Sequence, residues 1–304
     1  MENQAGNQSN DEKNFWEKTY KIWMLIPFAL TLFSLVYLSV FYANTGSLFY
    51  KDVSLTGGTS ITVYSSFDIS QLQNQLKQDF PDVVVRSMGD IASGKQIGFS
   101  VETASNATQL QEKIEGILEF KLTSDNSSIE FTGASLSQGF YKSLMLAMLI
   151  AFILMAIVVL VMFKTGVPSI AVIQAALTDI VVPIMVMDIF HVQISTAGIA
   201  AFLMLVGYSV DTDILLTNRT LRKIELPLRQ RFSSSLKTGL TMTLTSLLAV
   251  LAAYFVVFSP VLKQVFLILS VGLFVDMIST WLGNTAILKM WFDAKEKHRH
   301  MENR

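Results

Sequence analysis

Long apolar stretches separated by short polar segments make up most of the second half of the chain, and one more lies near its start. An α-helix needs about 20 mostly apolar residues to cross a bilayer. The stretches that meet this requirement are 21–42, 141–163, 168–190, 195–216, 239–258 and 264–290. The pattern predicts a polytopic α-helical membrane protein with six transmembrane helices, and residues 139–292 hold the last five of them.

A polar segment, residues 43–138, interrupts this pattern between the first and second predicted spans. β-branched and aromatic residues are typical of strands, whereas apolar residues spaced three and four apart indicate helices. The expected elements are strand 53–65, helix 68–80, strands 83–88 and 96–102, helix 107–122 and strand 128–132. This β-α-β-β-α-β order predicts one small α+β domain of the ferredoxin-like type.

Basic residues cluster between the fourth and fifth predicted spans, in a loop at 217–238. Loops rich in Lys and Arg lie on the cytoplasmic side of a membrane. Counting spans from this loop predicts a multi-pass protein of the cell membrane whose tails, 1–20 and 293–304, are both cytoplasmic. The same count predicts that the domain at 43–138 is extracytoplasmic.

Composition supports the membrane assignment and removes several classes of function. The chain is 51% hydrophobic and only 15% charged, and its net charge of −1 provides no basic surface for a nucleic-acid partner. The chain has no cysteine, and its three histidines show no metal-ligand spacing. We also find no nucleophile–base pattern or phosphate loop, so we expect a non-enzyme without cofactor or metal.

Four acidic residues fall inside the predicted spans. Asp179 and Asp276 lie near the middle of the third and sixth spans, and Asp211 and Asp213 lie in the inner half of the fourth. Charged groups are costly in hydrocarbon and usually mark an ion or proton path. Since no Lys or Arg lies at mid-span, burial favours the neutral, protonated form. These four residues are therefore candidates for a proton relay.

The alternative is that each Asp only hydrogen-bonds Ser, Thr or backbone groups and so holds the helices together. For Asp179 and Asp276 both interpretations stay open, whereas for Asp211 we favour a functional role. Asp211 and Asp213 are two positions apart, so in a regular helix they point to nearly opposite sides. We expect Asp211 to be the principal protonatable group and Asp213 to face a partner or the solvated interface.

Several motifs accompany these acids. The fourth span contains Gly207, Tyr208 and Ser209 and its motif continues to Arg219, and a Thr-Gly-Gly-Thr segment with Gly57 and Gly58 follows the first span. The stretch 236–248 is rich in Ser and Thr, and 271–288 is rich in small residues. Alone, the Gly pair is also typical of an ordinary turn. Together with the six-span layout, these segments resemble the SecF branch of the SecD/SecF family of protein-export membrane proteins.

The resemblance implies a fold related to the RND transporters, with a SecD partner supplying a second six-span half. It further implies work beside a SecY-type channel, contact of the outer domain with a translocating unfolded polypeptide, and contact with membrane lipids. The energy source that it implies is the proton-motive force, although a sodium gradient stays open. An RND-type exporter of small molecules or lipids and a purely structural scaffold are the other two functions considered.

The fourth-span motif departs from the bacterial pattern of the family. Bacterial SecF proteins typically read Asn-Asp-Thr where this chain has Asp211, Thr212 and Asp213, so their acid falls on Thr212. Asp211 instead matches the acidic position of SecD, and the Asp-Thr-Asp form suits the archaeal branch. The resemblance thus supports Asp211 through the SecD-like alignment, and Asp179 matches a position that is often acidic in the family.

Overall fold

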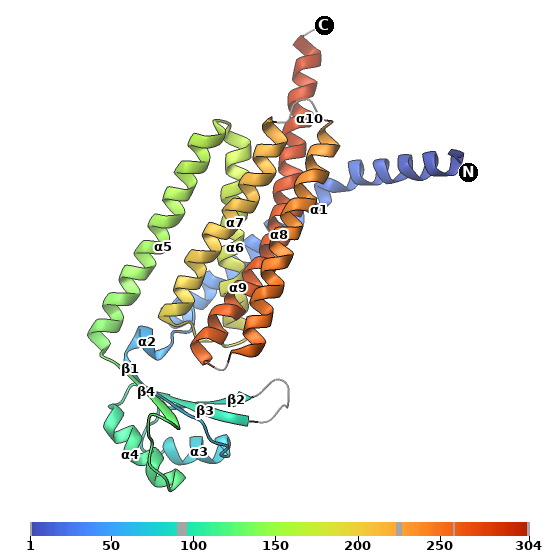
Figure 1. Ribbon diagram of the computed structural model, residues 1–304. Coiled ribbons are helices and arrows are strands. Elements are labelled where there is room, and N and C mark those ends of the chain that lie inside the picture. The colour runs from blue at the N-terminus through green and yellow to red at the C-terminus, as the bar shows by residue number, and fades with distance from the viewer. Residues whose placement is uncertain (1, 90–95, 223–226, 258, 303–304) are drawn as a thin grey trace.

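Figure 1 shows a bundle of long helices with a small α+β domain beneath one end, in a computed structural model that describes residues 2–89, 96–222, 227–257 and 259–302. Within these residues, six helices are long and apolar enough to cross a membrane. The first five are α1 (Glu2–Thr45), α5 (Ala134–Phe163), α6 (Gly166–Ile189), α7 (Thr196–Arg222) and α8 (Leu228–Val256). The last consists of α9 (Pro260–Ile278), the π-helix η1 (Ser279–Asn284) and α10 (Thr285–Glu302). The predicted polytopic fold is confirmed.

Several helices extend further than the hydropathy pattern indicated, and α10 continues to Glu302 through most of the segment expected as a tail at 293–304. The helix α1 begins at Glu2, so the segment expected as a tail at 1–20 continues the first span, and Figure 1 shows this part projecting away from the bundle. The helix α8 begins at Leu228, so much of the predicted loop 217–238 is helical, and residues 223–226 of that loop lie outside the described residues. Hydropathy indicates only the membrane-embedded length, whereas a helix already formed in the membrane can continue into water by adding one backbone hydrogen bond per residue.

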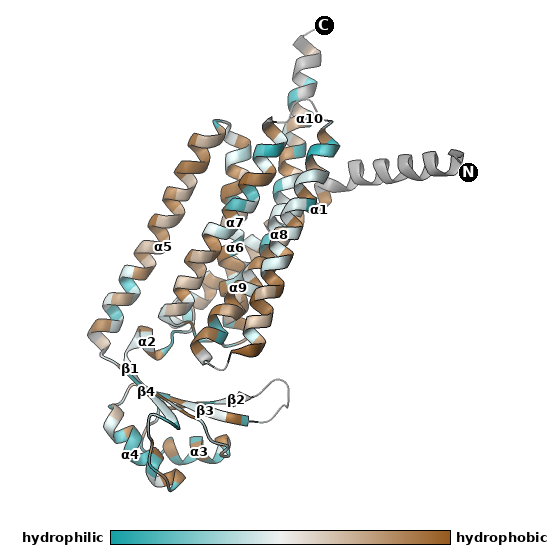
Figure 2. Cartoon of the chain, in the orientation of Figure 1, coloured by the Kyte–Doolittle hydropathy of each residue, from teal (hydrophilic) through white to brown (hydrophobic). Residues whose placement is uncertain are grey.

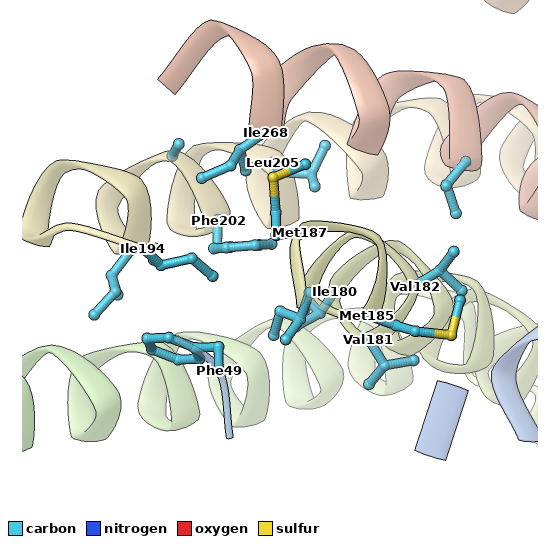
Figure 3. Close-up of a cluster of buried hydrophobic side chains, with 14 of the residues drawn as sticks. Phe49, Ile180, Val181, Val182, Met185, Met187, Ile194, Phe202, Leu205 and Ile268 are labelled. Carbon is cyan, nitrogen blue, oxygen red and sulfur yellow. The ribbon is translucent and has the colours of Figure 1, made fainter. Parts of the chain in front are cut away.

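The helices divide into central and peripheral ones. In the most apolar window of each span, 72% of α6 and 56% of α7 is buried, against 6% of α5 and 11% of α8. In the centre, Phe202 and Leu205 of α7 pack with Met187 of α6 and Ile268 of α9 (Figure 3). The outer surface of α5 is apolar along most of its length (Figure 2), which suits contact with lipid tails.

Small residues allow the central helices to approach one another closely. A Cβ atom at Gly272 of α9 would overlap the side chain of Leu205 on α7. A Cβ atom at Gly239 of α8 would likewise overlap the indole of Trp281 in η1. Close approach through small residues is the usual packing solution for helices in membranes, where hydrophobic burial provides little net drive.

The small domain between α1 and α5, which we call the outer domain after its predicted location, is the predicted ferredoxin-like sandwich. Its elements are β1 (Gly58–Val63), α3 (Ile69–Leu76), β2 (Val84–Gly89), β3 (Gln96–Thr103), α4 (Ala107–Leu118) and β4 (Ser127–Thr132). The antiparallel sheet has the order β2-β3-β1-β4. The expected first strand at 53–65 is too long, because residues Val53–Thr56 form the short helix α2, which Asp52 caps through the N–H of Ser54.

The two faces of the sheet differ in polarity. Ile61, Phe99, Leu72 and Ile114 form a core between the sheet and the helices α3 and α4, which lie on the side of the sheet away from the bundle (Figure 1). Residues at alternate positions of the strands point toward the bundle and are mostly polar. The outer domain therefore has a core of its own and turns a polar face to the membrane helices.

Replacing Phe99 by Ala tests this core. The side chain is fully buried, so its removal costs roughly 3–5 kcal/mol of domain stability. We expect proteolysis of the full-length variant to cut within residues 58–132 much faster than in the wild type. Ile129→Ala is the control, because Ile129 lies in the same sheet but is 40% exposed. Equal cleavage rates for the two variants would contradict the assigned core.

Candidate functional site

Three carboxyl groups meet inside the bundle, each from a different helix. Asp179 lies on α6, Asp213 on α7 and Asp276 on α9, and each side chain is at most 1% exposed. Adjacent residues connect them, since the Ser279 hydroxyl bonds Asp179 and the Thr280 hydroxyl lies within hydrogen-bond distance of both Asp213 and Asp276. The structure thus brings together three of the four predicted candidates.

Hydroxyl groups from two helices donate hydrogen bonds to both carboxyl oxygens of Asp179. The Ser209 hydroxyl of α7 donates to Oδ2 of Asp179, and the Ser279 hydroxyl of η1 donates to Oδ1 at 2.7 Å. Both donors are buried. Buried carboxyl oxygens need such partners, because an unpaired one carries its full desolvation cost. Ser209 of the predicted fourth-span motif is therefore part of the site.

Thr280 connects the other two carboxyl groups. Its hydroxyl is 2.8 Å from Oδ1 of Asp213 and 3.2 Å from Oδ1 of Asp276. The Asn284 side-chain amide also donates to Oδ1 of Asp213 at 2.8 Å. Because a hydroxyl has one proton to donate, Thr280 can serve only one carboxylate at a time and can accept from the other when that group is protonated.

The π-helical segment η1 supplies three of these polar side chains. Ser279 and Thr280 begin it and Asn284 ends it. π-helical turns inside α-helices are frequent at functional sites because they change which side chains share a face. None of these three residues was predicted, although Ser279, Thr280 and Asn284 follow Asp276 at spacings of three, four and eight, which place all of them on one helical face.

The cluster retains capacity for a cation or for additional protons. Oδ2 of Asp213, Oδ2 of Asp276 and Oδ1 of Asn284 are buried and have no hydrogen-bond partner among the described residues. Three carboxylates in a dry interior cannot all stay charged unless protons or cations are shared among them. Within the described ranges, no three His, Asp or Glu side chains are arranged to hold a metal ion. The arrangement is suited to holding and exchanging protons.

The structure reverses the expected placement of Asp211 and Asp213. Asp213 is fully buried in the cluster, whereas Asp211 is on the exposed side of α7. The expectation that Asp213 faces a partner or the solvated interface is wrong, because its side chain is buried within this chain, whereas the role of Asp211 as the principal protonatable group stays a prediction. The two residues do lie on opposite sides of a continuous helix, and Met204 and Gly207 share the exposed side with Asp211.

The remaining motif residues lie outside the cluster. Tyr208 hydrogen-bonds Ser246 of α8 at 3.0 Å, and the Arg219 guanidinium donates to the Thr238 hydroxyl of α8 at 2.8 Å. Both residues therefore join α7 to α8. Gly57 follows α2 and Gly58 begins β1, and their φ angles of 85° and 138° are in the region that favours glycine.

Fold and site together define a class: a polytopic membrane protein with one six-span bundle, ionisable groups at the centre of its spans and one ferredoxin-like domain. The family model described as protein export membrane protein SecD/SecF, C-terminal, matches residues 114–294. The chain belongs to the SecD/SecF family.

Similarity to individual proteins extends over nearly the whole chain. The protein-export membrane protein SecF of Methanocaldococcus jannaschii is 35% identical over 90% of this chain and 96% of its own length. SecF of Methanolacinia petrolearia is 32% identical over 89% of this chain and 93% of its own length. The crystal structure of SecDF from Thermus thermophilus, a translocon-associated membrane protein, matches with a TM-score of 0.70 at 22% identity, over 91% of this chain and 38% of that one. That structure supports the fold.

Replacing Asp213 by Ala tests the cluster as a structural unit. The change leaves the Asn284 amide and the Thr280 hydroxyl without their shared acceptor in the interior, at a cost of roughly 1–3 kcal/mol. We expect a lower unfolding temperature in detergent, followed by tryptophan fluorescence. Asp211→Ala, two positions away on the exposed side, should unfold at nearly the wild-type temperature. The reverse order would refute the assignment of Asp213 to the interior.

Proposed function

We infer that this chain acts as the SecF-type subunit of a membrane protein-export complex, together with a SecD-type partner, and that ion movement through its buried carboxyl cluster assists protein translocation. The observation that carries the SecF assignment is its similarity to archaeal SecF proteins along almost their full length. The partner and the ion coupling are argued from the geometry below.

The exposed side of α7 supports a companion half. Asp211 is exposed on this helix, and Thr241 and Thr245 are exposed on the neighbouring helix α8. A carboxyl group facing lipid at this depth is costly, so membrane proteins turn such groups toward a protein or water. The matched SecDF chain is more than twice as long as this one, since this chain spans 38% of it. A second six-span half of the SecD type would cover this polar surface.

The cluster supports ion coupling. Thr280 can exchange a hydrogen bond between Asp213 and Asp276, so adding or removing one proton changes which of the helices α7 and α9 it joins. A change in those contacts alters the packing of α7, the helix whose opposite side would contact the partner. Protons are our first choice of ion, and a sodium ion would use the same oxygen atoms.

The outer domain and the topology complete the proposal. With the basic segment between α7 and α8 in the cytoplasm, both termini are cytoplasmic and the segment 43–138 is extracytoplasmic. The domain would then lie where an unfolded polypeptide leaves a SecY-type channel. In this arrangement the ion gradient acts on the bundle, and the domain beside the membrane surface acts on the exported chain.

Replacing Asp213 by Asn tests the coupling. We expect gradient-dependent export by proteoliposomes holding the chain with its partner and channel to fall about tenfold or more, equivalent to at least about 1.4 kcal/mol. Thr280→Val, which is nearly isosteric and removes the connecting hydroxyl, should have a similar effect. The rate of export without a gradient should not change. Wild-type gradient dependence in both variants would overturn the role of the cluster.

A photo-crosslinking amino acid at position 204 tests the companion surface. Met204 is 62% exposed beside Asp211, so we expect adducts with a second multi-span chain in native membranes. The control is position 161 on α5, where Val161 is 66% exposed on the apolar side that faces lipid in our proposal. Mass spectrometry identifies the adducts. Equal protein adducts at both positions, or none at position 204, would contradict the assigned surface.

A further inference from the structure

A polar cleft lies between the sheet of the outer domain and the outer ends of the membrane helices. It has a volume of about 280 Å³. Its roof is the polar face of the sheet, with hydroxyl side chains of Ser60, Thr62 and Ser100, and its floor includes Gln193 and Gln264 from the bundle. Figure 1 shows the sheet lying below this end of the bundle, and the residues that line the cleft come from both parts. The carboxyl cluster of the bundle does not line it.

The floor of the cleft is fixed to the membrane helices. The N–H of Asp52 donates to the carbonyl of Ile194 at 3.0 Å, and the N–H of Ile194 donates to the carbonyl of Tyr50 at 2.7 Å. The N–H of Thr196 donates to the Ser54 hydroxyl at 3.1 Å. These bonds connect the chain before and within α2 to the outer end of α7. Asp52 therefore belongs to the membrane part of the molecule.

The helix α2 is connected to the sheet through Gly57, which caps its C-terminus, and Gly58, the first residue of β1. Gly57 and Gly58 both have positive φ, and a Cβ atom on Gly57 would overlap the backbone of Ala134, where the chain returns from the domain into α5. A Cβ atom on Gly58 would overlap the carbonyl of Thr103 on β3. The segment that enters the domain at Gly57 and the segment that leaves it at Ala134 are therefore in direct contact. Rotation of the backbone at this point would move the sheet relative to Asp52.

Glu102 is a buried acidic side chain of the sheet whose charge state can affect how the domain packs on the bundle. It lies on the central strand β3, is 7% exposed, and its Oε2 has no hydrogen-bond partner among the described residues. Arg86 of β2 is the nearest cation, at 3.9 Å, which is too long for a hydrogen bond. Besides Glu102, the charged and titratable side chains that line the cleft are Asp52, Tyr64, Arg86, Glu130, Tyr254 and Lys263.

We propose that Glu102 and Asp52 form a proton-operated latch between the outer domain and the membrane helices, with Gly57 and Gly58 as its pivot. With Glu102 protonated, the sheet stays seated over Asp52 as in the structure, which we call the closed position. With Glu102 charged, burial and the Asp52 carboxylate both oppose the closed position, so the domain tilts and Glu102 reaches water. The latch is a property of this chain and holds whether or not the export role is correct.

The direction of the pH response follows from the environment of Glu102. Burial raises the pKa of this carboxyl group from 4.5 to about 7, and Arg86 and Asp52 act on it with opposite signs. In water the group returns to its ordinary pKa, so opening releases a proton. The closed position is therefore favoured most strongly below about pH 4.5, loses this advantage as the pH rises from about 4.5 to 7, and loses nothing further above pH 7.

Spin labels on the full-length chain in lipid nanodiscs test the latch. The chain has no cysteine, so cysteines placed at the exposed positions Lys77 of the domain and Val256 of α8 are the only labelling sites. We expect the ratio of short-distance to long-distance populations to fall more than about tenfold between pH 5 and 7.5 in the wild type. Glu102→Gln should keep the short distance at every pH, because its neutral side chain has no charge to expose.

Two further variants move the midpoint in opposite directions. Asp52→Asn removes the nearby negative charge while keeping a capping side chain, so the transition should shift to lower pH. Arg86→Gln removes the favourable positive charge, so the transition should shift to higher pH. Glu130→Gln, on the same face of the sheet but exposed, should follow the wild type. A wild-type distance that does not change with pH, or a Glu102→Gln variant that responds like the wild type, would overturn the latch.

Discussion

Carboxyl groups that lie out of reach of water must be satisfied by neighbouring groups, and this constraint organises the bundle. Asp179, Asp213 and Asp276 come from three helices, and their donors come from α7 and η1. Moving one of these helices away would leave a buried acceptor or donor unpaired. The interactions that hold the central helices in register are thus the same ones that can carry a proton, so a change of protonation is also a change of packing.

The helix α7 connects the buried carboxyl groups to the exposed surface of the bundle. Its inward side carries Ser209 and Asp213, and its exposed side carries Gly207 and Asp211. A helix moves as a rigid body over short distances, so a rearrangement at the inward side is passed directly to the surface where a companion half would pack. The apolar exterior of α5 lacks such polar groups at membrane depth, which is why the two surfaces suit different neighbours.

At the end of the bundle next to the small domain, a short segment fixed by hydrogen bonds connects the membrane helices to the domain. The segment around Asp52 is bonded to the start of α7, and the sheet begins at Gly58, directly after Gly57. The polar face of the sheet is therefore held close to the helix that carries Asp213. Bundle and domain are connected through few residues, which favours movement of the domain as one body rather than its deformation.

The sequence by itself determined much of this architecture. Uninterrupted apolar stretches can only be satisfied in a bilayer as helices, and the β-α-β-β-α-β order of residues 58–132 admits few folds other than the one found. The acids within the spans were equally visible, because a charged residue in hydrocarbon is conspicuous in any hydropathy pattern.

Only the tertiary structure decided which of these acids faces the interior. Helical geometry places Asp211 and Asp213 on opposite sides, but the lipid and the bundle interior are both apolar, so the surrounding residues do not reveal which side is which. The π-helical turn that brings Thr280 and Asn284 to Asp213 is likewise set by the packing of η1 against its neighbours. Side-chain orientation in a membrane bundle depends on contacts between distant segments, and the local periodicity of the sequence does not predict those contacts.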